Sequence, residues 1–291
     1  MSAMRTDANA IRSVVLDGPY PTTVGFNDSL NVRPTAAFEQ LFADCAADVA
    51  CGAAFPDLRS RVIGMIERLN DSPVAAGGFT FTGDFALIAA ARALYQYTPG
   101  EFLAPEVPRA LSLAADGDFS ALAVLAAANF APDPTSTGTH GGDATSGVGR
   151  AVQCHDELPF LDRDRARQQS TVYPFGAAQG RFDGNVEFDI CPQFGAGQAD
   201  PSFRDPVVSS IPTLILTGTY DPTTPTEWAD ITAAALDASQ LIRFRGVGHI
   251  VITTGACPVQ IMQMFPDAPT VEVVRTCVAG YVPEFTTELP Q

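Results

Sequence analysis

Two polar side chains, Asp221 and His249, each follow an apolar run and are suited to acid–base chemistry. Asp221 comes after the run IPTLILTG at 211–218, and His249 comes after QLIRFRG at 240–246. A carboxylate that accepts the imidazole Nδ1–H fixes the tautomer and stabilises the imidazolium, so that the imidazole can take a proton from a nucleophile. The pair therefore indicates the acid and base of a hydrolytic triad.

The elements around these residues would bring them together. The continuous apolar run at 211–218 is typical of a buried parallel strand. A helix should open at TPTE, with Thr224 as N-cap and Glu227 completing a capping box, and a second strand should follow at 240–246. Strand, helix and strand form a βαβ unit with a right-handed crossover, and sites collect beyond the carboxyl ends of such strands.

Each residue alone has an ordinary structural explanation. Asp221 precedes a proline, and such a pair favours a turn, while a lone histidine is more often structural than catalytic. Their order and their position after successive strands favour the triad.

A nucleophile is harder to find. None of the 14 serines lies in a Gly-x-Ser-x-Gly pattern, with glycine two positions before and two positions after it. No cysteine lies in the corresponding Gly-x-Cys-x-Gly pattern. Ser146, in ATSGVG, is a weak candidate for a replacement nucleophile, with incidental loop chemistry as the alternative. HGG at 140–142 resembles an oxyanion loop, but no strand is expected before it.

Composition excludes several classes of function. All 17 basic residues are arginine, which excludes Ser–Lys dyads, Schiff-base chemistry and a P-loop lysine. The net charge of -16 argues against nucleic acid or an anionic membrane as a partner. No stretch approaches the roughly 18 apolar residues of a membrane helix.

The six cysteines form an even set without a CxxC motif, and the chain has only three histidines, so we expect neither a zinc site nor a cofactor. Structural disulfides are the better explanation, and they indicate an oxidising compartment. The N-terminus, MSAMRTDANA, lacks the apolar region of a signal peptide. The cysteines are Cys45, Cys51, Cys154, Cys191, Cys257 and Cys277.

The predicted fold class is α/β, with a core of a few parallel strands and a mainly helical second unit. Residues 1–34 would contain a core strand at 13–18, and residues 35–160 would be helical, as apolar spacings of three and four indicate. Residues 161–205 read as an irregular connector, and 206–291 as the part of the core with the acid and the histidine.

Several segments together resemble α/β-hydrolases of the tripeptidyl aminopeptidase-like group, the relatives of proline iminopeptidase. The resemblance implies a hydrolase core with a helical cap, and it maps the family's acid and base onto Asp221 and His249. It also implies Cys45–Cys51 and Cys257–Cys277 bridges, which leaves Cys154–Cys191 as a third. The segments are PTLILTGTYDPTTPTEWA at 212–229, GVGHIV at 246–251, SVVLDGPYP at 13–21, CAADVACGAAFPD at 45–57 and AVQCHDELPF at 151–160.

The chain departs from the family in one large respect. The family's Gly-x-Ser-x-Gly elbow and oxyanion loop lie before the point that corresponds to Met1, so we expect a truncated core that lacks the N-terminal half. The strand at 13–18 would then have an uncovered edge, a site for self-association or for a complementing N-terminal half.

The resemblance implies a serine-type hydrolase acting on small carboxylic esters or short peptides, from an extracellular or periplasmic parent family. One alternative is a catalytically inactive C-terminal fragment that acts as a binding or interaction module. A structural disulfide-rich module is another, although such a role would not need the residues at 206–257.

Overall fold

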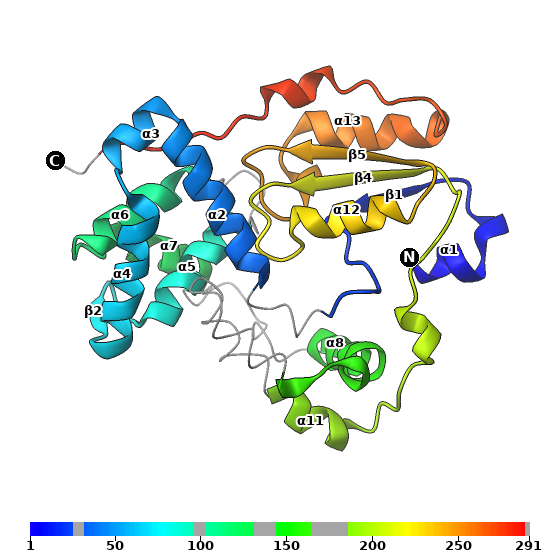
Figure 1. Ribbon diagram of the computed structural model, residues 1–291, viewed down its shortest axis with the longest axis horizontal. Coiled ribbons are helices and arrows are strands. Elements are labelled where there is room, and N and C mark those ends of the chain that lie inside the picture. Colours follow the sequence, from blue (N-terminus) through cyan, green and yellow to red (C-terminus); the bar gives the residue numbers. More distant parts are fainter. Residues whose placement is uncertain (26–31, 96–102, 131–143, 165–185, 289–291) are drawn as a thin grey trace.

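The computed structural model describes residues 1–25, 32–95, 103–130, 144–164 and 186–288. An α/β unit and a helical unit lie side by side, with a pair of further helices, α8 and α11, below the α/β unit in Figure 1. The α/β unit contains α1 (Ser2–Thr6), β1 (Val14–Asp17), β4 (Thr213–Gly218), α12 (Thr226–Ala234), β5 (Ser239–Phe244) and α13 (Ala256–Met264).

The sheet that positions the site has three parallel strands in the order β1-β4-β5. Asp17 at the end of β1 pairs in register with Leu216, and Gly218 at the end of β4 pairs with Phe244. The carboxyl ends of all three strands therefore meet at one edge of the sheet. The strand–helix–strand unit expected from the sequence is present as β4, α12 and β5.

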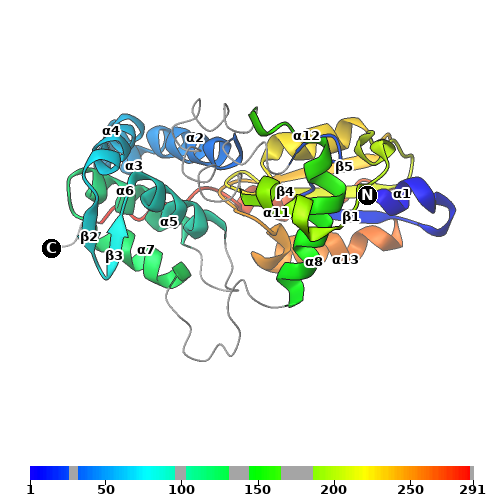
Figure 2. The ribbon, with the colours of Figure 1, turned by 90° about the horizontal axis from the view of Figure 1, so that it is seen from below.

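Both faces of the central strand are covered, which explains its uninterrupted apolar sequence. Leu214 and Leu216 pack on one side with Ile261 of α13, whereas Ile215 packs on the other side with Ala229 of α12. Figure 2 shows α12 and α13 on opposite sides of the sheet.

The helical unit buries one large apolar core, in which Leu58, Val62, Met65, Ile66 and Leu69 line one face of α4 at helical spacing. The unit comprises α2 (Val32–Ala47), α3 (Val49–Ala54), α4 (Leu58–Asp71), β2 (Val74–Ala76), β3 (Phe79–Phe81), α5 (Gly83–Tyr95), α6 (Val107–Ala115) and α7 (Ser120–Phe130).

A hairpin interrupts the helical unit that the sequence predicted for 35–160. β2 and β3 pair antiparallel through Gly77 and Gly78, whose φ angles are 57° and 84°. Two consecutive residues with positive φ are what a tight hairpin turn requires, and glycine adopts them without strain. The Gly-Gly pair was therefore the signal for the hairpin.

A third group of helices lies around the Cys154–Cys191 bridge. It consists of α8 (Ala144–Val152), a π-helical turn (Gln153–Glu157) and α11 (Val186–Phe194). The sequence indicated irregular structure for 161–205, so α11 is an addition to that prediction. The helix contains Pro192, and proline is unfavourable inside helices, so the sequence did not indicate a helix here.

Two further disulfides join Cys45 to Cys51 and Cys257 to Cys277. The first links α2 to α3, and the second links α13 to the short 3₁₀ helix Thr276–Gly280. These are the pairings that the family resemblance implied. None of the described helices is long and apolar enough to cross a lipid bilayer.

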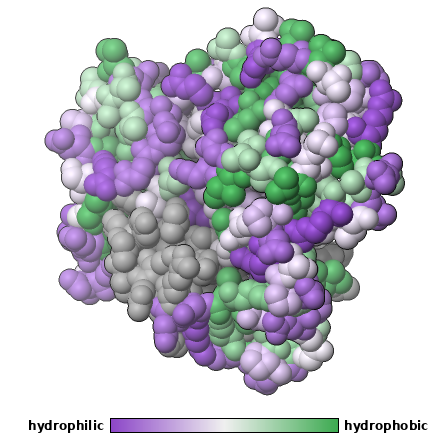
Figure 3. Space-filling model, turned by 45° about the vertical axis from the view of Figure 1, so that its right-hand side comes forward, coloured by the Kyte–Doolittle hydropathy of each residue, from purple (hydrophilic) through white to green (hydrophobic). Residues whose placement is uncertain are grey.

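The surface in Figure 3 shows hydrophobic residues as small groups among hydrophilic ones on the visible face. Isolated exposed apolar side chains such as Val208 and Ile231 are ordinary for a folded protein. The informative contacts lie instead where the helical unit meets the carboxyl ends of β4 and β5.

Candidate active site

The structure brings Asp221 and His249 into contact at the carboxyl ends of β4 and β5. Nδ1 of His249 lies 2.8 Å from Oδ2 of Asp221. The Asp221 side chain is 1% exposed and that of His249 15% exposed. With the proton on Nδ1, the imidazole donates to the carboxylate and keeps its Nε2 lone pair for a proton from another group.

Three donors from the following turn hold the carboxylate of Asp221. The backbone N–H groups of Thr223 and Thr224 donate to Oδ1 over 2.7 and 2.8 Å, and the Thr224 hydroxyl donates to Oδ2 over 2.6 Å. The Thr224 oxygen also lies 3.1 Å from Nδ1 of His249. The carboxylate is thus fixed in the orientation that receives the imidazole, and its burial is compensated by hydrogen bonds.

The role of Thr224 corrects a prediction from the sequence. Thr224 was expected to cap α12 in a capping box with Glu227, but the N-cap residue is Pro225 and makes no side-chain cap. The Thr224 hydroxyl donates to Asp221 instead. A charged acceptor in a buried site forms a stronger hydrogen bond than a neutral one, which accounts for the preference.

Close backbone approach at two glycines allows the histidine loop to reach the site. A Cβ on Gly218 would lie 2.2 Å from the carbonyl oxygen of Gly248, and a Cβ on Gly248 would lie 1.8 Å from that of Leu94. Neither position has room for a side chain. The segment before His249 therefore packs directly between the end of β4 and the last turn of α5.

The helical unit also contacts the histidine through an aromatic ring. Tyr95, the last residue of α5, stacks on the His249 imidazole with ring centroids 4.8 Å apart and planes at 27°. The Arg92 guanidinium lies 6.0 Å from the centroid of the Tyr95 ring. One face of the imidazole is thus covered. This contact could not be predicted from the sequence, because it joins elements that lie far apart in the chain.

The end of β1 completes the surroundings. Gly18 has φ +60° and faces Thr224, Asp221 and His249, while Asp17 accepts hydrogen bonds from the backbone of the segment after His249. The sequence predicted a core strand at 13–18 and assigned no site role to Asp17 or Gly18. The position of Asp17 after an apolar strand, like that of Asp221, was the signal that the two lie at the same edge of the sheet.

The nucleophile candidates have a different outcome. Ser146 lies in α8, and its side chain is outside the part of the chain that the structure describes, as are residues 140–142. All six cysteines are in disulfides. Among the hydrogen bonds of the described residues, none joins Nε2 of His249 to a serine, and those residues include no group of three or more potential metal ligands.

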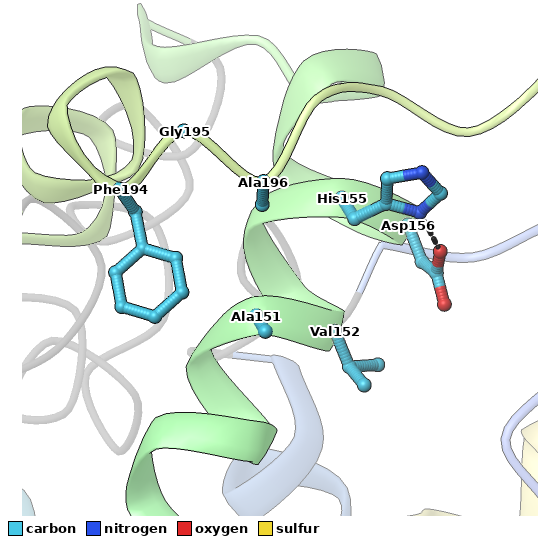
Figure 4. Close-up of a pocket in the computed structure, with 7 residues that line it drawn as sticks. All are labelled: Ala151, Val152, His155, Asp156, Phe194, Gly195 and Ala196. Carbon is cyan, nitrogen blue, oxygen red and sulfur yellow. Dashed lines mark hydrogen bonds and ion pairs between the residues drawn. The ribbon is translucent and has the colours of Figure 1, made fainter.

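A second histidine–aspartate pair lies at a separate pocket, shown in Figure 4. Nδ1 of His155 is 2.5 Å from Oδ1 of Asp156, and the pair borders a pocket of about 520 Å³ with mainly apolar walls. His155 was not among the candidate site residues predicted from the sequence. The pocket is lined by Ala151, Val152, His155, Asp156, Phe194, Gly195 and Ala196, all from the α8 and α11 region.

Comparison with known proteins gives the site its family context. The family described as TAP-like protein, within the α/β-hydrolases, matches residues 180–277, which include Asp221 and His249. The chain carries a TAP-like α/β-hydrolase domain. The match covers β4, α12, β5 and α13 and ends at Cys277. It therefore includes two of the three strands of the sheet, those that precede the acid and the histidine.

Curated relatives of the chain are serine proteases. This chain is 30% identical over 125 residues to serine protease Hip1 of Mycobacterium bovis (strain ATCC BAA-935 / AF2122/97). The same identity over the same length holds for Hip1 of two Mycobacterium tuberculosis strains, CDC 1551 / Oshkosh and ATCC 25618 / H37Rv. The matched segment is 40% of this chain and 23% of each protease. The match therefore spans less than a quarter of the length of these relatives.

Proposed function

We propose that this chain is a serine-type hydrolase for small carboxylic esters or short peptides, in which Asp221 orients His249 as the general base. The observation that carries the proposal is the 2.8 Å contact between Nδ1 of His249 and a carboxylate already fixed by three other donors. The resemblance to a serine protease supports the reaction class.

The geometry supports a two-step acyl transfer. As a nucleophilic hydroxyl attacks the substrate carbonyl carbon, Nε2 of His249 takes its proton, and Asp221 stabilises the imidazolium that results. The imidazolium then gives this proton to the leaving alcohol or amine as the carbonyl re-forms. Water repeats the sequence on the acyl intermediate and regenerates the free hydroxyl.

Two sources of the hydroxyl are open to test. Ser146 is the candidate within this chain. The other source is a further strand added along β1, which among the described residues pairs with β4 alone. Because a Cβ on Gly18 would lie 3.3 Å from Cε1 of His249, a parallel strand beside β1 would end close to the imidazole. We propose that this edge mediates self-association or binds a complementing N-terminal half.

Turnover of p-nitrophenyl acetate and p-nitrophenyl butyrate tests the general base. His249→Ala should abolish turnover and Asp221→Asn should reduce it by about 10⁴-fold, by analogy with the loss of a triad acid. His155→Ala is the matched control, because it removes a histidine from the other histidine–aspartate pair and should leave turnover unchanged. Undiminished turnover in His249→Ala would refute the proposal.

A fluorophosphonate probe identifies the nucleophile. Labelling that disappears in Ser146→Ala assigns the hydroxyl to this chain. Labelling that appears only in a higher-order assembly assigns it to a partner strand. Light scattering decides whether such an assembly exists, since a mass of 30.7 kDa in dilute buffer corresponds to one chain and counts against the proposed edge contact.

The second candidate function is a catalytically inactive binding or interaction module. It is favoured by the lack of any serine bonded to Nε2 of His249 in the described residues. No covalent labelling by the probe, together with no ester turnover, would select this function. Under either function, three disulfides are typical of an oxidising compartment, and we propose an extracytoplasmic location.

A further inference from the structure

We propose that Asp17, at the end of β1, is a positioning residue that holds His249 in place through the backbone that follows it. The inference rests on the proposed role of His249 as the general base. It concerns a strand that supplies neither the acid nor the histidine.

Asp17 binds the chain just after His249 with both carboxylate oxygens. The N–H of Val251 donates to Oδ1 over 2.9 Å, and the N–H of Ile252 donates to Oδ2 over 2.9 Å. These amides open a short 3₁₀ turn, Val251–Thr253, whose own N-cap, Ile250, makes no side-chain hydrogen bond. Two residues that lie more than 230 positions apart in the chain are thereby joined next to the imidazole.

The residue between His249 and this clamp has a strained backbone. Ile250 has φ 60° and ψ 75°, and only Asp57 shares a positive φ among the described residues other than glycine. A β-branched side chain in the left-handed region persists only where surrounding contacts enforce it. Asp17 supplies those contacts on one side of Ile250, and the His249–Asp221 bond and the packing of Gly248 against Leu94 supply them on the other.

The position of β1 makes the clamp possible. Asp17 pairs with Leu216 of β4, and the N–H of Gly18 donates to the Leu216 carbonyl oxygen over 2.9 Å, which fixes the strand end beneath the histidine. A Cβ on Gly18 would lie 3.3 Å from Cε1 of His249. The strand end therefore leaves no room for a side chain beside the ring, while its carboxylate binds the backbone two and three residues after His249.

The chemistry of the clamp requires a carboxylate. Two N–H donors need two acceptor oxygens, and an asparagine would present one acceptor and one competing NH₂ donor. Burial raises the pKa of Asp17 above the ordinary aspartate value, the two N–H groups and His249 lower it in part, and Asp221 adds to the rise. Among the described residues, no arginine forms an ion pair with Asp17. A half-buried carboxylate that binds two backbone N–H groups without such an ion pair is consistent with a positioning role.

Asp17→Asn tests the proposal by NMR, without reliance on turnover. We expect the Val251 and Ile252 amides to exchange about tenfold faster or more and the ring resonances of His249 to shift. Asp48→Asn is the matched control, because Asp48 also accepts a backbone N–H, that of Cys51, but at the start of α3. It should change α3 amides alone. Unchanged His249 ring resonances in folded Asp17→Asn would overturn the proposal.

A double-mutant cycle covers the case in which Asp17→Asn does not fold. Ile250→Gly removes the strain that the clamp opposes, so the combined variant should fold and should lose less stability from Asp17→Asn than the wild-type background does. Strict additivity of the two changes would overturn the proposal. If the protein shows turnover, Asp17→Asn should lower kcat with little change in KM. Absent turnover counts against the proposed function and leaves the NMR result to decide the role of Asp17.

Discussion

Gly18 lies so close to His249 that a side chain at this position would contact the imidazole. A Cβ built on Gly18 would lie 3.3 Å from Cε1 of His249 and 2.7 Å from Oγ1 of Thr224, and Gly18 has φ +60°. The strand at the edge of the sheet therefore limits the space around the acid–base pair, although it contributes neither member.

Gly18→Ala should be destabilising for two reasons. The positive φ is unfavourable for alanine by about 1 kcal/mol or more, and the new methyl group would displace the Thr224 hydroxyl from Asp221. Gly78→Ala is the matched control, because Gly78 has φ +84° but open space at its Cβ position. Urea unfolding measures both variants, and the larger loss should belong to Gly18→Ala. Equal losses would show that crowding at the site has no energetic effect.

Thr224→Val should weaken the support of Asp221 while it conserves shape. The buried hydroxyl donates to a carboxylate over 2.6 Å, and a hydrogen bond to a charged group contributes about 1.5–3 kcal/mol. Thr232→Val provides the comparison, because the Thr232 hydroxyl is also buried but donates to a neutral acceptor, the Trp228 carbonyl oxygen. Chemical denaturation should show the smaller loss for Thr232→Val. The reverse order would contradict the role assigned to Thr224.

Tyr220 should resist ionisation in the folded protein. Burial raises the pKa of its phenol well above the ordinary value of 10.0, and the hydrogen-bonded carboxylate of Asp44 raises it further. Because the folded pKa is the higher one, this group's contribution to stability is complete below pH 10 and is lost only as pH rises through the folded value.

Ultraviolet titration of the phenolate checks this prediction on a chain with six tyrosines. Tyr220→Phe should leave the native amplitude unchanged up to about pH 11, because Tyr220 is still protonated there. In denaturant, the same substitution should remove one tyrosine from the amplitude. A smaller native amplitude in the variant below that pH would mean that Tyr220 titrates normally.

Removal of the Cys257–Cys277 bridge should lower the free energy of unfolding. Its 20-residue separation corresponds to about 3 kcal/mol of chain entropy, compared with a smaller contribution from the Cys45–Cys51 bridge with its separation of 6. The double variant Cys257→Ser/Cys277→Ser should therefore show a lower denaturation midpoint. Thiol titration of unfolded wild-type protein should find free sulfhydryls only after reduction, and six free groups before it would refute all three bridges.

Periodicity explains which parts of the fold could be predicted. The apolar run of β4 is buried on both faces, and the following strand lies beside it, so the sequence was sufficient to place Asp221 and His249 at neighbouring strand ends. The prediction for Thr224 was wrong because the local sequence fits a capping box. In the folded protein the Thr224 hydroxyl donates to the buried Asp221 carboxylate instead, and only the tertiary structure reveals this partner.

The remaining features depend on contacts between distant segments. Asp17 and Gly18 look like an ordinary turn until β1 is placed beside β4, and the stacking of Tyr95 on His249 joins helices of one unit to a loop of the other. A local sequence pattern does not predict contacts between segments that lie far apart in the chain. The hairpin at Gly77-Gly78 was different, since its turn residues were visible in the sequence and were outweighed by the surrounding helical periodicity.

Tyr220 and Asp221 are consecutive residues that serve different parts of the molecule. The Tyr220 ring lies in the apolar core of the helical unit and its hydroxyl donates to Asp44 of α2, whereas Asp221 binds His249. One peptide bond thus couples the two units mechanically. A displacement of α2 would therefore be transmitted to the backbone that carries the Asp221 carboxylate.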